Sequence, residues 1–143
     1  MKTVLFAFLI FISANVMSQE YAPGQTWEYK TRDTEKSSKL TILKVEKYDD
    51  LGEVIHIRID QVKMINPIKG NEITDIPHLP FKKKALDSSI TKFKGMETVP
   101  DFQEGYDTWK AAYDEGQAGA FETTVKETLE ALLGAEWIEK EGA

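Results

Sequence analysis

Three runs of alternating apolar and polar residues between positions 24 and 62 constrain the fold of this chain more than any other feature. Alternation at a period of two is typical of a β-strand that buries one face. The polar segments 33–38 and 49–52 separate the runs, and Gly52 permits a tight turn with positive φ. The sequence therefore predicts a three-stranded antiparallel meander. The residues that it would bury are Trp27, Tyr29, Leu40, Ile42, Ile55, Ile57 and Ile59.

Burial also selects a register for this meander. Placing Trp27 opposite Ile42, and Ile42 opposite Ile59, gathers the apolar side chains on one face. A shift by one residue would place charged side chains there instead. Leu43 and Val45 fall on the opposite face, so we expect something to cover part of it. That face would carry Glu28, Lys30, Arg32, Thr41, Leu43, Val45, His56, Arg58 and Asp60.

The first 18 residues have the pattern of a signal peptide. Lys2 supplies a positive charge, an apolar run follows at residues 4–12, and Val16 and Ser18 are small residues at positions −3 and −1 of a cleavage site. The run is shorter than the about 20 apolar residues of a membrane-spanning helix. We therefore expect an exported protein, periplasmic or extracellular, without a stable membrane anchor after cleavage. A retained anchor or a buried helix is the alternative.

Residues 19–135 are predicted to form one domain, followed by a charged tail at 136–143 that frays. Without the leader, the chain carries 17 Lys and Arg against 24 Asp and Glu. This acidity argues against a nucleic-acid partner, because phosphate contacts need basic side chains. The chain contains no Cys, so its stability must come from its core without disulfides. We predict no cofactor.

Helices are predicted in the second half of the chain. Residues 82–92 carry an apolar stripe of helical spacing. Asp101 and Glu104 have the spacing of a capping box at the start of a second predicted helix, on which Phe102, Tyr106, Trp109 and Tyr113 form one stripe. Thr124 and Glu127 have the same spacing at the start of a third predicted helix, which extends to residue 133. The predicted fold class is α+β, with a three- to four-stranded antiparallel meander packed on one face by about three helices. Its shared core would contain Trp27, Ile42, Ile57, Phe102, Trp109 and Leu129.

Several short motifs occur in a fixed order along the chain. They are GQTWEY at 24–29, a His-Ile pair at 56–57, HLPF at 78–81, PDFQEGYDTW at 100–109 and AGAF at 118–121. This order resembles a group of small uncharacterised bacterial proteins with the patterns GQxWxY, HLPF, PDFxEGYxxW and AGAF. The resemblance covers roughly residues 24–121. It implies no activity, cofactor or catalytic residue, and the leader departs from most members.

The two histidines and their charged neighbours are the candidate binding residues. His56, Arg58 and Asp60 alternate on one strand, so their tips can form an acid–base site, an anion site or a charged surface. His78 lies between two prolines, where we expect a half-buried imidazole bonded to a backbone carbonyl. Zinc needs three or four ligands, and the two histidines are distant in sequence. We therefore predict no metal site.

No nucleophile elbow, phosphate-binding loop or zinc-protease motif is present in the sequence. We predict a non-catalytic binding or interaction module, inhibitor-like or immunity-like, that binds another protein or a small ligand. The alternative is a hydrolase with a site around His56, His78 or the acidic cluster at 97–107, which contains Glu97, Asp101, Glu104 and Asp107. A deep pocket with a histidine and carboxylates would favour the hydrolase, and a flat acidic surface would favour a partner.

Overall fold

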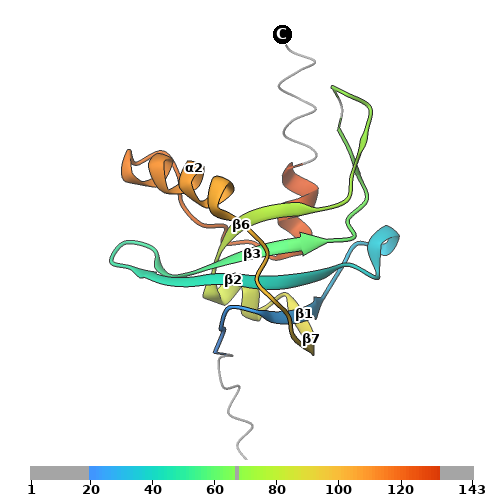
Figure 1. Ribbon diagram of the computed structural model, residues 1–143, viewed down its shortest axis with the longest axis horizontal. Helices are drawn as coiled ribbons and strands as arrows, with labels where there is room; N and C mark the ends of the chain where they lie inside the picture. Colours follow the sequence, from blue (N-terminus) through green and yellow to red (C-terminus); the bar gives the residue numbers. More distant parts are fainter. Residues whose placement is uncertain (1–19, 67, 133–143) are drawn as a thin grey trace, which may run out of the picture.

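A curved antiparallel sheet of five strands is the centre of the fold (Figure 1). The computed structural model describes residues 20–66 and 68–132. The spatial order of the strands is β6-β3-β2-β1-β7. The predicted α+β class and the central meander are confirmed, but the sheet has five strands where three or four were expected. The strands are β1 (Gln25–Tyr29), β2 (Lys39–Tyr48), β3 (Gly52–Asp60), β6 (Ile76–Lys82) and β7 (Ile90–Met96).

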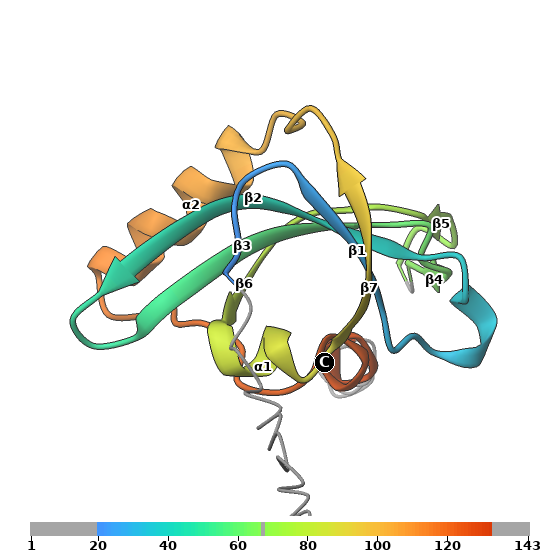
Figure 2. The same ribbon diagram turned by 90° about the horizontal axis from the view of Figure 1, so that it is seen from below.

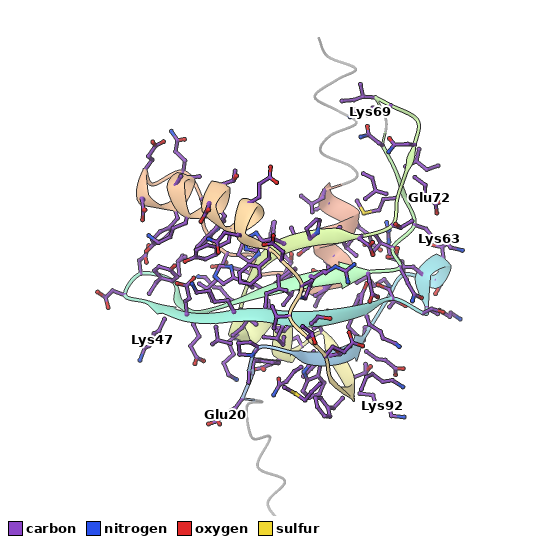
Figure 3. All side chains as sticks on the ribbon, viewed as in Figure 1. Glu20, Lys47, Lys63, Lys69, Glu72 and Lys92 are labelled. Atoms are coloured by element: carbon purple, nitrogen blue, oxygen red, sulfur yellow. The ribbon has the colours of Figure 1, made fainter. Side chains whose placement is uncertain are left out.

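Shorter elements complete the described chain. A 3-10 helix, η1 (Asp33–Glu35), precedes β2, and a two-stranded hairpin of β4 (Met64–Ile65) and β5 (Glu72–Ile73) follows β3. This hairpin projects beyond the end of the sheet, with Lys69 near its tip (Figure 3). The helices are α1 (Lys83–Asp87), α2 (Gln103–Asp114) and the helical residues 125–132.

The inner, concave face of the sheet carries the predicted core. All seven residues assigned to this face by alternation are buried, from Trp27 to Ile59. Phe81 and Leu86 pack against them from β6 and α1, and Leu129 does so from the helical residues 125–132. Each fully buried side chain of this size contributes roughly 1.5–3 kcal/mol. Figure 2 shows α1 and residues 125–132 beneath the concave side of the sheet.

The predicted helix over residues 82–92 is wrong. α1 ends at Asp87, and the chain then returns as β7 beside β1. Ser89 links the end of α1 to its neighbours: its hydroxyl donates to the Ala85 carbonyl and accepts from the Val125 amide. Pairing with β1 satisfies backbone groups that would otherwise form a sheet edge, and this outweighs the local helical spacing.

The helix α2 packs on the outer face of the sheet and not on the inner core, contrary to the prediction (Figure 2). Tyr106 and Trp109 of its aromatic stripe are buried against Val54, so the helix supplies the cover that the apolar outer-face residues predicted. The expectation that all helices pack on one face, with Trp27 and Trp109 in a single core, is therefore wrong. The sheet is apolar enough on its outer face to bury a second layer.

The predicted register of the meander is off by two residues. Trp27 pairs with Leu40, and Ile42 pairs with Ile57. A shift of two residues keeps every side chain on its face, so the set of buried residues was predicted correctly while the pairs were not.

A β-bulge at Leu43 changes the faces of the second half of β2. Ile42 pairs with Ile57 and Lys44 pairs with His56, so Leu43 has no counterpart on β3. Beyond the bulge, Lys44 and Glu46 lie on the same face as His56. Val45, predicted on the outer face, packs against the inner core instead. A bulge re-aims side chains in this way because it adds one residue to an alternating pattern.

The predicted leader at residues 1–18 and the charged tail at 136–143 lie outside the described residues. Among the described helices, none is long and apolar enough to cross a membrane.

Candidate functional site

The two histidines of the sequence form one hydrogen-bonded chain with a carboxylate. Nδ1 of His56 lies 2.8 Å from Nε2 of His78, and Nε2 of His56 lies 2.8 Å from Oε1 of Glu46. The two imidazole rings are stacked, with centroids 5.0 Å apart. We refer to Glu46, His56 and His78 as the histidine chain. The partner of His78 is thus His56, and not the backbone carbonyl that we expected.

Three adjacent strands position the histidine chain. The bulge at Leu43 turns Glu46 towards His56, and β6 pairs with β3 so that Pro80 lies opposite His56. α2 then approaches His78 closely at Gly105, where a Cβ atom would lie 3.0 Å from the Cβ of His78. A side chain at position 105 would force the helix or His78 to move.

Aromatic rings enclose the middle of the histidine chain. The side chain of His56 is fully buried, and Tyr106 and Trp109 contact its ring edge-to-face at centroid distances of 5.2 and 4.9 Å. The indole N–H of Trp109 donates to the Gly119 carbonyl at 2.8 Å. These contacts hold the imidazole of His56 in one orientation, since it can rotate only by displacing packed rings.

The carboxylate of Glu46 sets the direction of the hydrogen bonds. Burial alone would raise the pKa of Glu46, but a hydrogen bond from the Tyr106 hydroxyl and the charge of Lys44 hold it below its usual value. An ionised carboxylate only accepts, so Nε2 of His56 donates to it. Neutral His56 then accepts at Nδ1 from Nε2–H of His78. This assignment leaves a lone pair on Nδ1 of His78.

Both imidazoles are neutral at pH 7. Burial lowers the pKa of His56, and the attraction of Glu46 only partly opposes this effect. Burial lowers the pKa of His78 to about 4, and the neighbouring His56 adds to the shift. Among the described residues, Nδ1 of His78 makes no hydrogen bond. The histidine chain therefore ends in an unprotonated nitrogen.

His78 lines two adjoining hollows on the surface. The polar hollow, of about 560 Å³, is formed with the start of α2. The apolar hollow, of about 410 Å³, is formed with the first two turns of α2, up to Trp109, and with residues 118–121. The two share His78, Gly105 and Thr108. The polar hollow is lined by Pro77, His78, Asp101, Phe102, Gln103, Glu104, Gly105 and Thr108. The apolar hollow is lined by His78, Leu79, Pro80, Gly105, Thr108, Trp109, Ala118, Gly119, Ala120 and Phe121.

The other predicted binding residues lie apart from the histidine chain. Arg58 pairs with Asp75 at 3.3 Å and with Asp60 at 4.0 Å, and Asp60 accepts from the Lys39 amide at 3.0 Å. Burial raises the pKa of Asp60, although the Lys39 amide and Arg58 oppose this. Arg58 and Asp60 thus form a charge network at one end of the sheet.

The predicted acidic cluster divides between several places. Asp101 and Glu104 line the polar hollow, and Asp101 also accepts from the Gln103 amide at the start of α2. Asp107 accepts from the Gln103 side chain. Glu97 follows β7, where its amide donates to Gly24. No group of three His, Asp or Glu side chains in the described part of the chain could hold a metal ion.

Stability is expected to fall as the pH decreases from about 6.5 to about 4. In this range the unfolded chain protonates His78, while the folded protein, with a pKa of about 4, resists protonation. A full shift corresponds to roughly 3 kcal/mol, and the partial exposure of the ring reduces the expected loss to about 1–2 kcal/mol. The lowered pKa values of His56 and Glu46 also reduce stability as the pH falls. The raised pKa of Asp60 has the opposite effect on stability. Urea unfolding at pH 7 and pH 4.5 measures the difference.

His78→Gln is the control for this pH dependence, because it removes the titrating ring and keeps a polar side chain. The variant should lose less stability between the two pH values than the natural protein. Equal losses in both proteins would show that His78 does not cause the effect.

The motif residues that carry the resemblance described above meet at this site. The His-Ile pair supplies His56, HLPF supplies His78, and the segment 100–109 supplies Tyr106 and Trp109. A scan against protein-family models finds no match, and neither do searches of curated proteins and of solved structures. The function is therefore inferred from the chemistry of the site.

Proposed function

We propose that this protein is a hydrolase in which Nδ1 of His78 acts as the general base. Composition and motifs favour a binding module, but the arrangement of the side chains supports the hydrolase alternative better. The observation that carries the proposal is the histidine chain, which ends at His78, a residue that lines a hollow together with the carboxylates of Asp101 and Glu104. A general base of this kind needs a fixed orientation and a route for the proton, and the histidine chain offers both.

The proposed reaction is the hydrolysis of an ester by water. Nδ1 of His78 accepts a proton from a water molecule in the hollow, and the water oxygen attacks the carbonyl carbon. The proton returns from His78 to the leaving alkoxide oxygen when the carbon–oxygen bond breaks. The products are a carboxylic acid and an alcohol, so atoms and charges balance.

The histidine chain can also share the positive charge during this reaction. When Nδ1 of His78 gains a proton, its Nε2 proton can pass to Nδ1 of His56, at 2.8 Å. The charge then lies on His56, beside the ionised Glu46 at 2.8 Å. The low pKa keeps His78 unprotonated at neutral pH, and the nearby carboxylate compensates for the weak basicity that a low pKa brings.

The test is hydrolysis of p-nitrophenyl acetate at pH 7.5. We expect His78→Gln to lower kcat/KM at least tenfold, because general bases contribute roughly 10²–10⁴-fold. Glu46→Gln should lower kcat/KM by a smaller factor, since it keeps the shape of the histidine chain and removes only the charge of its carboxylate. Unfolded protein at the same concentration controls for the reactivity of free imidazole. Glu28→Gln is a second control, because Glu28 lies on β1, three strands away from β6 in the sheet.

Two outcomes would contradict the proposal. One is a natural protein no faster than its unfolded control across esters, amides and phosphate esters. The other is full activity in His78→Gln.

The second candidate is the binding module predicted from the sequence, with another protein or a small ligand as its partner. Its support is that His78 lines two open hollows and that its Nδ1 makes no hydrogen bond among the described residues. A ligand that donates a hydrogen bond would be held there without turnover. In that case His78→Gln would lose ligand binding, measured by calorimetry, while neither protein showed hydrolysis. For either candidate, the pattern of residues 1–18 supports export to the periplasm or beyond.

A further inference from the structure

We infer that the substrate of this site carries a short apolar acyl group that occupies the apolar hollow, with a polar alcohol on the other side of His78. This inference rests on the proposed hydrolase function and names its substrate class. The apolar hollow is walled by Leu79, Pro80, Trp109, Ala118, Ala120 and Phe121, and no Asp, Glu, Lys or Arg lines it. Such a wall favours a hydrocarbon group, which gains free energy when it leaves water.

Hydrogen bonds fix the walls of the apolar hollow before any ligand binds. The Phe121 amide donates to the Pro80 carbonyl at 2.9 Å, and the Lys82 amide donates to the Phe121 carbonyl at 3.0 Å. These two bonds hold the segment 118–121 against β6. The indole N–H of Trp109 ties the same segment to α2 through the Gly119 carbonyl. A preformed hollow binds its ligand with little loss of conformational entropy.

Small side chains leave the space open. Ala118, Gly119 and Ala120 follow one another along the wall, so the cavity of about 410 Å³ is not filled by the protein itself. Ligand pockets in proteins have volumes of about 300–1,000 Å³, so a hollow of this size can hold a chain of several methylenes.

The position of His78 decides where the reacting bond would lie. His78, Gly105 and Thr108 line both hollows, so a substrate that spans them places its central bond beside His78. Asp101, Gln103 and Glu104 line the larger, polar hollow and can accept or donate hydrogen bonds to an alcohol. The alcohol is the group that must take a proton from His78 and leave, so we assign it to the polar side.

A chain-length series of p-nitrophenyl esters tests the acyl assignment with a constant leaving group. We expect kcat/KM, relative to the rate with free imidazole, to rise at least tenfold from acetate to hexanoate. Hexanoate ion should also inhibit competitively at lower concentrations than acetate ion. This second measurement needs no variant.

Ala120→Leu places extra bulk inside the hollow and should lower the hexanoate-to-acetate ratio at least fivefold. Ala111→Leu adds the same bulk on the exposed side of α2 and should keep the natural ratio. A flat chain-length series, or an unchanged ratio in a folded Ala120→Leu variant, would overturn the acyl assignment alone. Absence of any hydrolysis that depends on His78 would overturn the proposed function itself.

Discussion

Trp109→Ala is expected to lower the free energy of unfolding by about 3–5 kcal/mol. The side chain of Trp109 is 8% exposed, and its ring contacts Tyr48, His56 and Tyr113. Its indole N–H is also the donor to Gly119. The substitution would remove these contacts together and leave a cavity between α2 and the outer face of the sheet. Urea unfolding followed by circular dichroism measures the loss.

Thr108→Ala, one residue earlier on α2, is the matched control. Thr108 is exposed, so its loss should stay within about 0.5 kcal/mol. A Trp109→Ala variant as stable as this control would mean that α2 does not pack on the sheet as described.

Arg32→Ala is expected to lower the free energy of unfolding by about 2–4 kcal/mol. Nε and Nη2 of Arg32 donate to the two carboxylate oxygens of Glu35, at 2.6 and 2.9 Å. Glu35 is 2% exposed and also accepts from the Lys63 amide. Removal of one partner of a buried pair costs about 3–5 kcal/mol because the other charge stays buried, and the 15% exposure of Arg32 reduces this range. Urea unfolding at pH 7 measures it.

The double variant Arg32→Ala/Glu35→Gln separates the lost charge from the lost packing. A neutral amide at position 35 can keep the bond to Lys63 without an unpaired charge, so the double variant should be more stable than Arg32→Ala. Arg58→Ala, which removes a partly exposed pair with Asp75 and a longer contact with Asp60, should cost less than about 1 kcal/mol. If the losses at Arg32 and Arg58 were equal, the burial of Glu35 would have no energetic consequence.

The inner face of the sheet could be predicted because alternation reports burial directly. The seven residues assigned to it, from Trp27 to Ile59, are all buried. α2 was also predictable, since the spacing of the aromatics along it fits only a helix. The start of the helical residues 125–132 was predictable as well, because the Thr124 hydroxyl accepts from the Glu127 amide, as a capping residue does. The pairing of strands was harder, because a period of two cannot distinguish registers that differ by two residues.

The histidine chain could not be assembled from the sequence because both of its contacts, Glu46 with His56 and His56 with His78, depend on tertiary structure. Strict alternation along β2 places Lys44 and Glu46 on the inner face beside Ile42, where burial forbids unpaired charges. That conflict was a signal: the apolar residues change phase from Ile42 to Leu43 and Val45, as a bulge requires. The approach of His78 to His56 had no such signal, since it follows from the pairing of β6 with β3.

The extra residue at Leu43 makes the site depend on where the bulge lies as well as on which residues β2 contains. If Leu43 were paired opposite His56 without a bulge, Lys44 and Glu46 would turn onto the inner face, so the carboxylate would leave His56 and two charges would enter the core. Deletion of Leu43 would have the opposite outcome, because Lys44 would still pair with His56 and Glu46 with Val54. Two related chains could therefore differ by one residue in β2 and still bring the same carboxylate to the histidines. For comparisons among such chains, a gap placed one position wrongly in β2 would align a proton acceptor with a core residue.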